Sequence, residues 1–308
     1  MSLHGQPVFY KVCSVKYRSL TLASVTLILG APLPLRVDDL ADLQTKASAG
    51  DAMAQLELSR AYYYGRGLDK DPGQALEWAQ KAAESGHVEA MEGLAFLYAK
   101  GEGIEQNEET SMNWYRKAAE KGSSKAMFNL GVLLRQSEKL RPSPSESLRW
   151  LEKAAEKGDL KAQAFLGQLH LLGDQYVTPD PSKAKPHLLA AAEKGDPVAQ
   201  NALGVLYRDR PSDPADDKEA ERWFRAAARQ NHPKAQSNLG NLIGGTLAGE
   251  DMNAEGLAWL LVAEENGEHT AEKMISLMKE NILPGKMLEA KQVANKLKQE
   301  LKAVGDKK

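Results

Sequence analysis

Residues whose side chains could carry out chemistry are few in this chain and lie far apart in the sequence. Cys13 is the single cysteine among 308 residues, so neither an intrachain disulfide nor a cysteine-rich metal site can form. The sequence contains no H-E-x-x-H, G-x-S-x-G or P-loop motif. Its six histidines are scattered without metal-ligand spacing: His4, His87, His170, His187, His232 and His269. We therefore predict no catalytic residue, no cofactor and no metal ion.

A stretch rich in glycine and aspartate, GRGLDKD at 65–71, is the other feature that could suggest chemistry. It lacks the ligand number of an EF-hand calcium loop and the Lys-Ser/Thr pair of a P-loop. Glycine favours the left-handed conformation that ends a helix, whereas aspartate favours the position just before one. We therefore expect a loop in which Gly65 ends one helix and Asp71 begins the next, with Gly101 and Asn107 as their equivalents further along.

The amino-acid composition limits the classes of function that are expected for this chain. The chain has 40 basic and 42 acidic side chains and a formal net charge of −2. Such a balance gives no long-range attraction to nucleic acid, which usually requires a basic stripe, so we predict no nucleic-acid partner. The apolar fraction of 42% and the charged fraction of 27% are typical of a folded domain with its own core.

Residues 1–36 differ in character from the rest. Three basic residues, Lys11, Lys16 and Arg18, precede the apolar run LTLASVTLIL at 20–29, which small residues and two prolines follow. This order is typical of a secretory signal peptide, and the run is shorter than the roughly 20 residues that span a membrane. We predict a signal peptide or an uncleaved anchor, the alternative being a wrongly assigned start. The chain would then lie in the periplasm, or at the inner membrane facing it, with membrane contact through this segment alone.

The tryptophans reveal an internal repeat. Trp78, Trp114 and Trp150 are 36 residues apart, His187 follows after 37, and two further steps of 36 lead to the last two tryptophans. A common string surrounds each position: WAQKAAESG at 78–86, WYRKAAEKG at 114–122, WLEKAAEKG at 150–158, HLLAAAEKG at 187–195, WFRAAARQN at 223–231 and WLLVAEENG at 259–267. His187 is thus interpreted as a substitute for a core aromatic ring, and His87 and His232 as surface or capping residues.

A second string follows each of these and predicts a second helix. An alanine is followed after four residues by an aliphatic residue and then at once by a small one, as in Ala126, Leu130 and Gly131. Spacings of three and four place such residues on one helical stripe. The small residue lets a neighbouring helix approach closely, and we expect the tryptophan ring to fill the remaining gap. Each repeat is therefore predicted to be helix A, a loop, helix B and a terminating Gly or Asn.

These strings define the domain organisation. Residues 37–50 form an N-terminal helix, 51–267 hold six repeats, and 268–308 hold a partial repeat with a capping helix at 285–304. The six repeats are 51–86, 87–122, 123–158, 159–195, 196–231 and 232–267. Irregular loops bearing proline, at 136–145, 173–182 and 209–217, interrupt the later copies. Insertions of this kind collect on one edge of a solenoid and can carry specificity.

The consensus A-x-x-x-L-G-x-x-Y, G-x-G and W-x-x-K-A-A-E-x-G resembles the Sel1-like repeat, a relative of the tetratricopeptide repeat. The resemblance covers residues 51–282, although copies three and five lack the G-x-G and copy four lacks the tryptophan. It implies an all-α fold, a right-handed α/α superhelical solenoid that binds proteins and has no catalysis of its own. A cysteine-rich branch of the family uses disulfides between repeats, and this chain lacks those cysteines.

In a related helical-hairpin array, helix A lines the concave face, so the side chains at −2, +2 and +5 from each consensus leucine should point into a groove. Aromatic residues and arginines, which are frequent binding hot spots, concentrate in the first copies. An alternative is that Phe96 and Phe128 only pack between repeats. The predicted protein-binding residues are Arg60, Tyr63, Tyr64, Glu92, Phe96, Lys100, Phe128, Arg135, Gln168, Asn201 and Arg208.

The resemblance, together with the export-type segment, leads to a protein-binding scaffold in the periplasm of a Gram-negative bacterium. Exported members of the family include immunity proteins that neutralise toxic phospholipase effectors of the type VI secretion system, so the partner could be such a lipase. An envelope signalling or assembly adaptor fits the same features. The rival classes are a hydrolase acting on peptidoglycan, which would need a nucleophile–base pair or metal ligands in the groove, and a cytoplasmic assembly scaffold.

Overall fold

The computed structural model describes residues 37–101, 104–137, 144–209, 215–244, 253–278 and 282–305. These residues form fifteen α-helices and no strand, which confirms the all-α prediction for the described part of the chain. The helices are α1 (Val37–Ser48), α2 (Ala52–Tyr64), α3 (Pro72–Glu84), α4 (Val88–Lys100), α5 (Glu108–Glu120), α6 (Ser124–Gln136), α7 (Pro144–Glu156), α8 (Leu160–Leu172), α9 (Pro181–Glu193), α10 (Pro197–Asp209), α11 (Ala215–Ala228), α12 (Pro233–Gly244), α13 (Ala254–Glu265), α14 (His269–Met278) and α15 (Pro284–Gly305).

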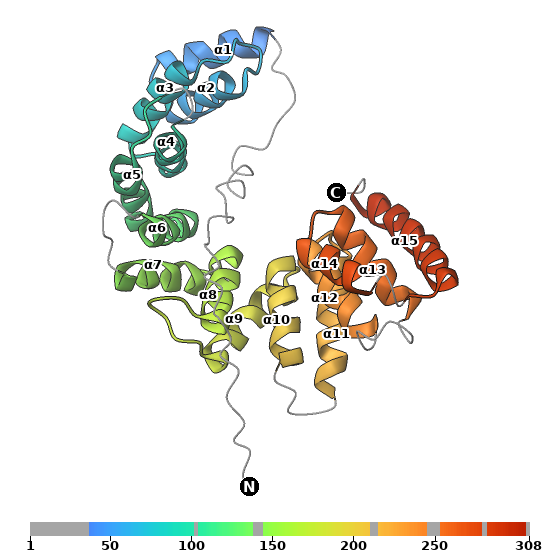
Figure 1. Ribbon diagram of the computed structural model, residues 1–308. Coiled ribbons are helices and arrows are strands. Elements are labelled where there is room, and N and C mark those ends of the chain that lie inside the picture. Colours follow the sequence, from blue (N-terminus) through green and yellow to red (C-terminus); the bar gives the residue numbers. More distant parts are fainter. Residues whose placement is uncertain are drawn as a thin grey trace. The chain divides into compact units, whose positions relative to one another are not determined.

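The chain divides into two compact units, Met1–Gln106 and Asn107–Lys308, called here the N-terminal and C-terminal units. Within each unit, consecutive helices pack as antiparallel hairpins, and each hairpin stacks on the next (Figure 1). The helix pairs follow the repeat of about 36 residues, so this is the stacked-hairpin fold of an α-solenoid. The predicted export segment, residues 1–36, lies outside the described residues. None of the described helices is both long enough and apolar enough to cross a membrane.

Helix A begins in the same way in six copies. The backbone N–H of the alanine that opens the helix-A string donates to a side chain three residues earlier, which satisfies one of the unpaired donors at the helix start. The accepting residues are Asp51, His87, Ser123, Asp159, Asp196 and His232, at distances of 2.7 to 3.3 Å. The prediction that His87 and His232 are capping residues is thereby confirmed.

The predicted helix terminators are also confirmed. Gly65 and Gly101 end α2 and α4 in the left-handed conformation, and Asp71 and Asn107 cap the helices that follow. Helix B ends in every described copy at a residue with positive φ. In five copies this residue is glycine, and in one it is Asn231 with φ 59°, which alone among the described non-glycine residues has a positive φ. Asparagine is the residue that best replaces glycine there, because it tolerates this conformation.

Glutamines of helix A tie four of the hairpins to the helix before them. Their side-chain Nε2 donates to the carbonyl oxygen eight residues earlier, near the end of the preceding helix, which also accepts a backbone N–H from the residue that ends that helix. The four bonds, 3.1 to 3.3 Å long, join Gln55 to Ala47, Gln163 to Ala155, Gln200 to Ala192 and Gln236 to Ala228. In these four places a single side chain therefore joins consecutive repeats by giving the carbonyl a second hydrogen bond.

Helices A and B of a hairpin touch where both carry a small residue. Ser147 Oγ donates to the Gly131 carbonyl at 2.6 Å, and Ser59 Oγ donates to the Ala75 carbonyl at the same distance. In the sixth hairpin the facing residues are Gly240 and Gly256, and a Cβ added to Gly240 would lie 2.7 Å from the Gly256 carbonyl oxygen. Such contacts need side chains no larger than serine, which explains the small residue on each helix-A stripe.

The tryptophan is not the residue that fills the gap beside the helix-A glycines, so this part of the prediction was wrong. A Cβ added to Gly131, Gly167, Gly204 or Gly240 would instead meet the residue that follows the tryptophan position: Leu151, Leu188, Phe224 and Leu260 respectively. The tryptophan is offset from this following residue by about 100° around the axis of helix B, which is the angle between successive residues of a helix. Its ring therefore lies to one side of the contact with helix A. Trp78 and Trp114 are only half-buried there.

The consensus lysine three residues after the tryptophan covers its ring. The Lys81, Lys117 and Lys153 ammonium groups lie 4.0 to 4.7 Å from the ring centroids of Trp78, Trp114 and Trp150. At such distances the cation and the ring face attract each other by about 0.5–1 kcal/mol at partly exposed sites. The W-x-x-K string is therefore a cation–π pair on the surface of helix B.

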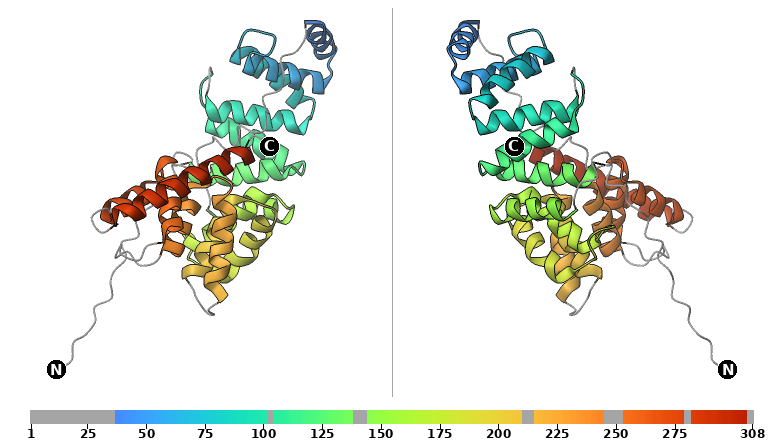
Figure 2. Two further views of the ribbon diagram at one scale, coloured as in Figure 1. Left: turned by 90° about the vertical axis from the view of Figure 1, so that its right-hand side faces the viewer. Right: turned by 90° about the vertical axis from the view of Figure 1, so that its left-hand side faces the viewer.

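The sixth hairpin is closed by α14 and α15. Both pack on α13, and the long helix α15 lies along it at the C-terminal end (Figures 1 and 2). The inner face of α15 buries Ala290, Ala294 and Leu301. Its outer face carries exposed polar side chains, including Lys291 and Lys296. This is the amphipathic pattern expected of a helix that ends an array.

Candidate functional site

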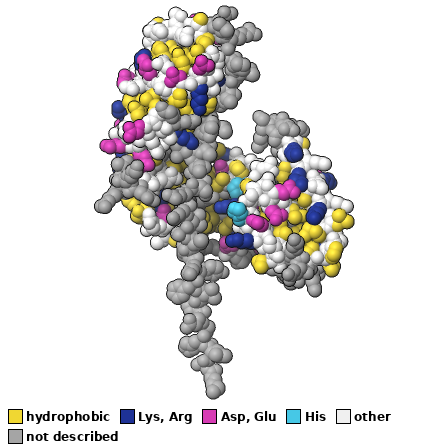
Figure 3. Space-filling model, turned by 45° about the horizontal axis from the view of Figure 1, so that its top comes forward, with side chains coloured by type: hydrophobic (Ala, Val, Ile, Leu, Met, Phe, Trp, Pro, Cys, Tyr) yellow, Lys and Arg dark blue, Asp and Glu magenta, His cyan; other side chains and the backbone are white. Residues whose placement is uncertain are grey.

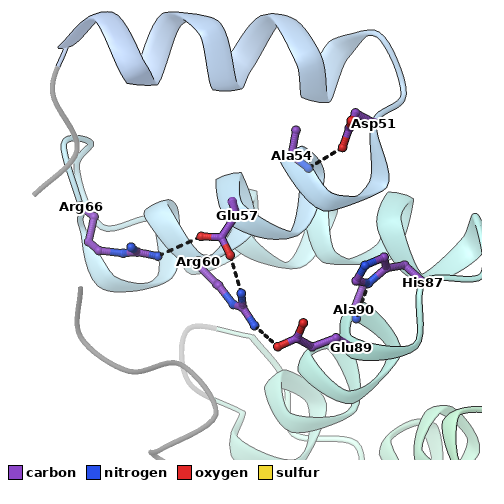
Figure 4. Close-up of polar contacts among 8 residues, drawn as sticks. All are labelled: Asp51, Ala54, Glu57, Arg60, Arg66, His87, Glu89 and Ala90. Carbon is purple, nitrogen blue, oxygen red and sulfur yellow. Dashed lines mark hydrogen bonds and ion pairs between the residues drawn. The ribbon is translucent and has the colours of Figure 1, made fainter. Parts of the chain in front are cut away.

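In the N-terminal unit, four charged side chains form a network across α2, α4 and the loop after α2 (Figure 4). Arg60 pairs with Glu57 on its own helix and, at 2.5 Å, with Glu89 on α4. Arg66 reaches the other oxygen of Glu57 at 3.6 Å. Burial alone would lower the pKa of Arg60, but the hydrogen bonds from both carboxylates raise it. The network thus joins two successive helix-A elements with a permanently charged guanidinium.

An aromatic cluster lies in the same unit. The Tyr63 ring makes edge contacts with Tyr64, at 5.0 Å between centroids, and with Phe96 of α4, at 6.2 Å. The Lys70 and Lys100 ammonium groups lie 5.6 Å and 5.9 Å from the Tyr63 and Phe96 centroids. The structure therefore brings together the predicted residues of copies one and two.

These side chains do not line an open groove as predicted. Glu92 is only 5% exposed, Phe96 is 6% exposed and Tyr63 is also buried. Arg60 is held by Glu57 and Glu89. The positions that were expected to face a partner instead contact the neighbouring repeat, because the +2 and +5 residues of one helix A lie against the next. Tyr64 is half-buried and Lys100 is exposed, so these two retain accessible surface.

In the C-terminal unit the predicted residues separate into three contacts between repeats. The rings of Phe128 and Phe165 meet edge to face at 6.2 Å, which agrees with the packing alternative for Phe128. Arg135 pairs with Asp174 in the loop after α8. Arg208 donates to Asn238 at 3.1 Å, and Asn238 donates to Asn201 at 2.9 Å. Asn201 is buried by these contacts, whereas Gln168 and Arg208 are half-buried.

A further set of polar contacts between successive repeats lies on the helix-B elements and was not predicted from the sequence. Arg116 pairs with Glu146 of the next copy at 3.1 Å, and Glu146 also accepts from the Trp150 indole at 3.4 Å. Three copies later the same triad is Arg225, Glu255 and Trp259, with a pair distance of 2.6 Å. The hydrogen bond from Arg225 lowers the pKa of Glu255. The sequence pattern that could have predicted these contacts is an Arg two residues after one tryptophan and a Glu four residues before the next.

Two histidines of the C-terminal unit face each other, and the pKa of each is lowered. His170 of α8 and His187 of α9 lie with ring centroids 6.2 Å apart and planes within 14°. His187 is half-buried, as are Trp78 and Trp114 at the equivalent position. Burial lowers the pKa of both, with the charges of Lys183 on His170 and of His170 on His187 acting in the same direction. Among the described residues no set of three or more His, Cys, Asp or Glu side chains is placed to hold a metal ion.

We expect the C-terminal unit to lose stability as the pH falls below the ordinary histidine pKa of 6.5. The folded-state pKa of both histidines is lower than that of the unfolded chain, so between the two values the unfolded chain binds protons that the folded chain does not. Each pKa unit by which the folded and unfolded states differ changes the free energy of unfolding by about 1.4 kcal/mol. Urea unfolding between pH 7.5 and 5.5 measures the loss.

The matched variants isolate the pair from other acid effects. His187→Trp restores the residue found in the other copies and should reduce the loss, while His269→Asn removes an exposed histidine and should leave it unchanged. Half-buried Asp159 and Asp196 have raised pKa values and act in the opposite direction, whereas burial lowers the pKa of His232, which acts in the same direction. All three are common to the variants and cancel in the comparison. An unchanged acid response in His187→Trp would show that the pair does not cause the loss.

The family model described as Sel1 repeat matches this chain five times, at residues 52–87, 88–123, 124–159, 160–196 and 197–232. It does not extend to the sixth hairpin, α12 and α13. A Sel1 repeat protein from Oxalobacter formigenes is similar in structure with a TM-score of 0.64 and 26% identity, over 79% of this chain and 96% of that one.

Two further solved structures are more distant. The protective antigen c5321 of uropathogenic Escherichia coli has a TM-score of 0.43 and 25% identity, over 84% of this chain and 71% of that one. The immunity protein Pa5087 of Pseudomonas aeruginosa has a TM-score of 0.41 and 20% identity, over 82% and 86%. No curated protein matches the chain.

Proposed function

This chain belongs to the Sel1 repeat family of protein-interaction scaffolds, and we propose that it acts in the bacterial periplasm by binding one partner protein. The observation that carries the proposal is that every described helix takes part in the stacked hairpins or closes their end, with none left over to form another domain. A chain that consists of such a repeat array is suited to binding a partner protein. The export-type pattern at 1–36 supports the periplasmic placement.

The partner is more narrowly a toxic phospholipase delivered by a type VI secretion system, which this chain neutralises as an immunity protein. Blocking an enzyme requires only that a rigid surface covers its active site, and an exported array of repeats is sufficient for that. Acidic and basic side chains are interspersed on the face drawn in Figure 3, so binding would depend on local contacts rather than on a field of one sign.

Two measurements test the proposal. Residues 1–45 fused to a reporter active only outside the cytoplasm should produce signal, and its absence would rule out the periplasmic placement. The full chain, tagged at its C-terminus and recovered from periplasm, should bring down one protein in a fixed ratio. That protein should hydrolyse phospholipid when alone and lose this activity on addition of equimolar chain.

The second measurement separates the candidate functions. A captured phospholipase that remains active in the complex would rule out immunity but keep the scaffold. A captured protein of another class, such as an envelope sensor or assembly factor, would favour the adaptor function. Failure to recover any partner at stoichiometric level would contradict the scaffold itself.

A further inference from the structure

The loop between α8 and α9, residues 173–180, exposes an aromatic ring. Tyr176 is 56% exposed, and Leu172, the last residue of α8, is 61% exposed. Among the described residues, six large hydrophobic side chains are this accessible: Met53, Leu172, Tyr176, Leu277, Leu283 and Leu288. Two of the six are thus four positions apart at a single loop, although burying them would be favourable by about 25 cal/mol per Å².

The backbone of this loop is fixed by hydrogen bonds. Asp174 Oδ1 accepts from the backbone N–H groups of Tyr176 and Val177, at 2.8 and 2.9 Å. The Asp174 N–H donates to the Val177 carbonyl at 2.8 Å, and the Asp180 N–H donates to the His170 carbonyl at 2.6 Å. Gly173 starts the loop at φ 68°, ψ 178°, a conformation essentially restricted to glycine. Tyr176 is therefore presented on a defined turn.

A charged pair anchors the loop to the preceding repeat. Asp174 Oδ2 accepts from the Arg135 guanidinium of α6, and both side chains are mostly buried. The same guanidinium lies 5.8 Å from the Tyr176 ring centroid, within reach of a cation–π contact. Arg135 was predicted to contact a partner in the groove. Its position shows that it holds the loop and supports one side of the Tyr176 ring.

An exposed tyrosine that is already fixed is well suited to binding. Ordering a free loop on association costs about 0.5–1.5 kcal/mol for each immobilised side chain. In this loop the hydrogen bonds and the ion pair already order the backbone before a partner binds, so most of that cost does not reduce the affinity. Tyrosine is among the residues that most often dominate binding energy, because it offers a large apolar ring and one hydroxyl.

The charges beside the loop indicate the chemistry of the partner. Lys183, in the first turn of α9, is 68% exposed, and Lys185 is exposed as well. The carboxylate of Asp174 is neutralised by Arg135, and that of Asp180 caps α9 and lies 4.0 Å from Lys183. The accessible cationic side chains at the start of α9, just after the loop that carries Tyr176, are therefore Lys183 and Lys185.

We propose that Leu172 and Tyr176 are the main contact through which the C-terminal unit docks its partner protein, and that the partner offers an apolar pocket rimmed by carboxylates. This inference rests on the proposed function and specifies its binding surface. The proposed surface is one preorganised loop. The predicted groove is set aside, because most of the side chains expected in it contact neighbouring repeats.

The test uses the full chain and the partner purified as described above. Tyr176→Ala and Leu172→Ser should each weaken binding by about tenfold or more in isothermal titration calorimetry, as expected for hot-spot positions. Lys183→Glu should lower the association rate and reduce its dependence on salt. The controls are Leu277→Ser, which removes another exposed leucine, and Gln168→Ala in the predicted groove; both should bind like the wild type.

Arg135→Ala provides a second readout. Hydrogen exchange of residues 173–180 should speed up while that of α10 to α13 stays unchanged, and partner affinity should fall with it. If Tyr176→Ala and Leu172→Ser bind as tightly as the wild type, or if Gln168→Ala is the variant that loses affinity, the docking loop is overturned while the scaffold stands. If no partner is recovered, the proposed function fails first and the docking loop with it.

Discussion

Replacing Gly256 with alanine should destabilise the C-terminal unit by about 3 kcal/mol, near the upper end for adding a single methyl group to a packed core. The added Cβ would lie 2.4 Å from Gly244 Cα, 2.6 Å from Gly244 N and 2.8 Å from the Gly240 carbonyl oxygen. All three are backbone atoms, so no rotamer change can relieve the clash, and α12 and α13 must move apart. Alanine is favoured over glycine in a helix by about 1 kcal/mol, which offsets only part of this cost.

Two other glycines calibrate the measurement. Gly285→Ala, in the first turn of α15, meets no atom within 4 Å and should be neutral or slightly stabilising. Gly167→Ala brings its Cβ to 2.4 Å from Leu188 Cδ2 and 2.6 Å from Cγ, side-chain atoms that can shift, while the nearest backbone atom, Leu188 N, is 3.1 Å away, so its cost should lie between the two. Urea unfolding followed by circular dichroism gives the order Gly256, Gly167, Gly285. Equal midpoints for Gly256→Ala and wild type would mean that α12 and α13 do not meet backbone to backbone.

Gly256 belongs to a pattern of small residues that is visible in the sequence. The position three residues before each tryptophan is small in every copy: Ala75, Ser111, Ser147, Ala184, Ala220 and Gly256. This is the helix-B partner of the small residue already recognised on helix A. The helix-A residue alone was predicted to make the contact, with the tryptophan ring opposite it. A search for small residues repeating on both strings would have found the pair.

Helix ends and the repeat itself could be predicted because their causes are local. A capping side chain and its N–H lie three residues apart, and a glycine that ends a helix acts on its own φ angle. The binding surface could not be predicted in the same way. Arg60 and Glu89, or Arg135 and Asp174, are 29 and 39 residues apart, and only the stacking of successive repeats brings them together. Whether a helix-A side chain faces solvent or its neighbour depends on that stacking.

The exposure of Tyr176 illustrates the same limit. The string GDQYVTPDPS predicts an irregular loop, and nothing in it distinguishes Tyr176 from a tyrosine folded back on the core. Its position follows from the Asp174 hydrogen bonds and from a guanidinium in the previous copy. Residues that the repeat consensus does not specify are therefore positioned by contacts that the consensus cannot predict.

Tryptophans at equivalent positions of the repeat should differ widely in their contribution to stability. Trp259→Ala should cost about 3–5 kcal/mol, the range for deleting a large ring from a closed core. Trp259 is 1% exposed and belongs to a cluster that includes Phe224, Leu239 and Leu301 of α15. Its indole N–H also donates to Glu255, the residue bound by Arg225. Removing the ring would leave a cavity under α15 and weaken the attachment of the terminal helix.

Trp78→Ala is the matched comparison and should cost about 1–2 kcal/mol, because a half-buried side chain returns less apolar area to water. Its ring packs on a small cluster of Ala47, Ala54 and Leu58, and its other face is covered by Lys81. Because the two tryptophans lie in different units, hydrogen exchange of peptides from each unit is a better measure than one global transition. Trp259→Ala should speed up exchange throughout α13 and α15. Equal costs for the two variants would contradict the packing of α15 over Trp259, since the repeat pattern alone treats both tryptophans alike.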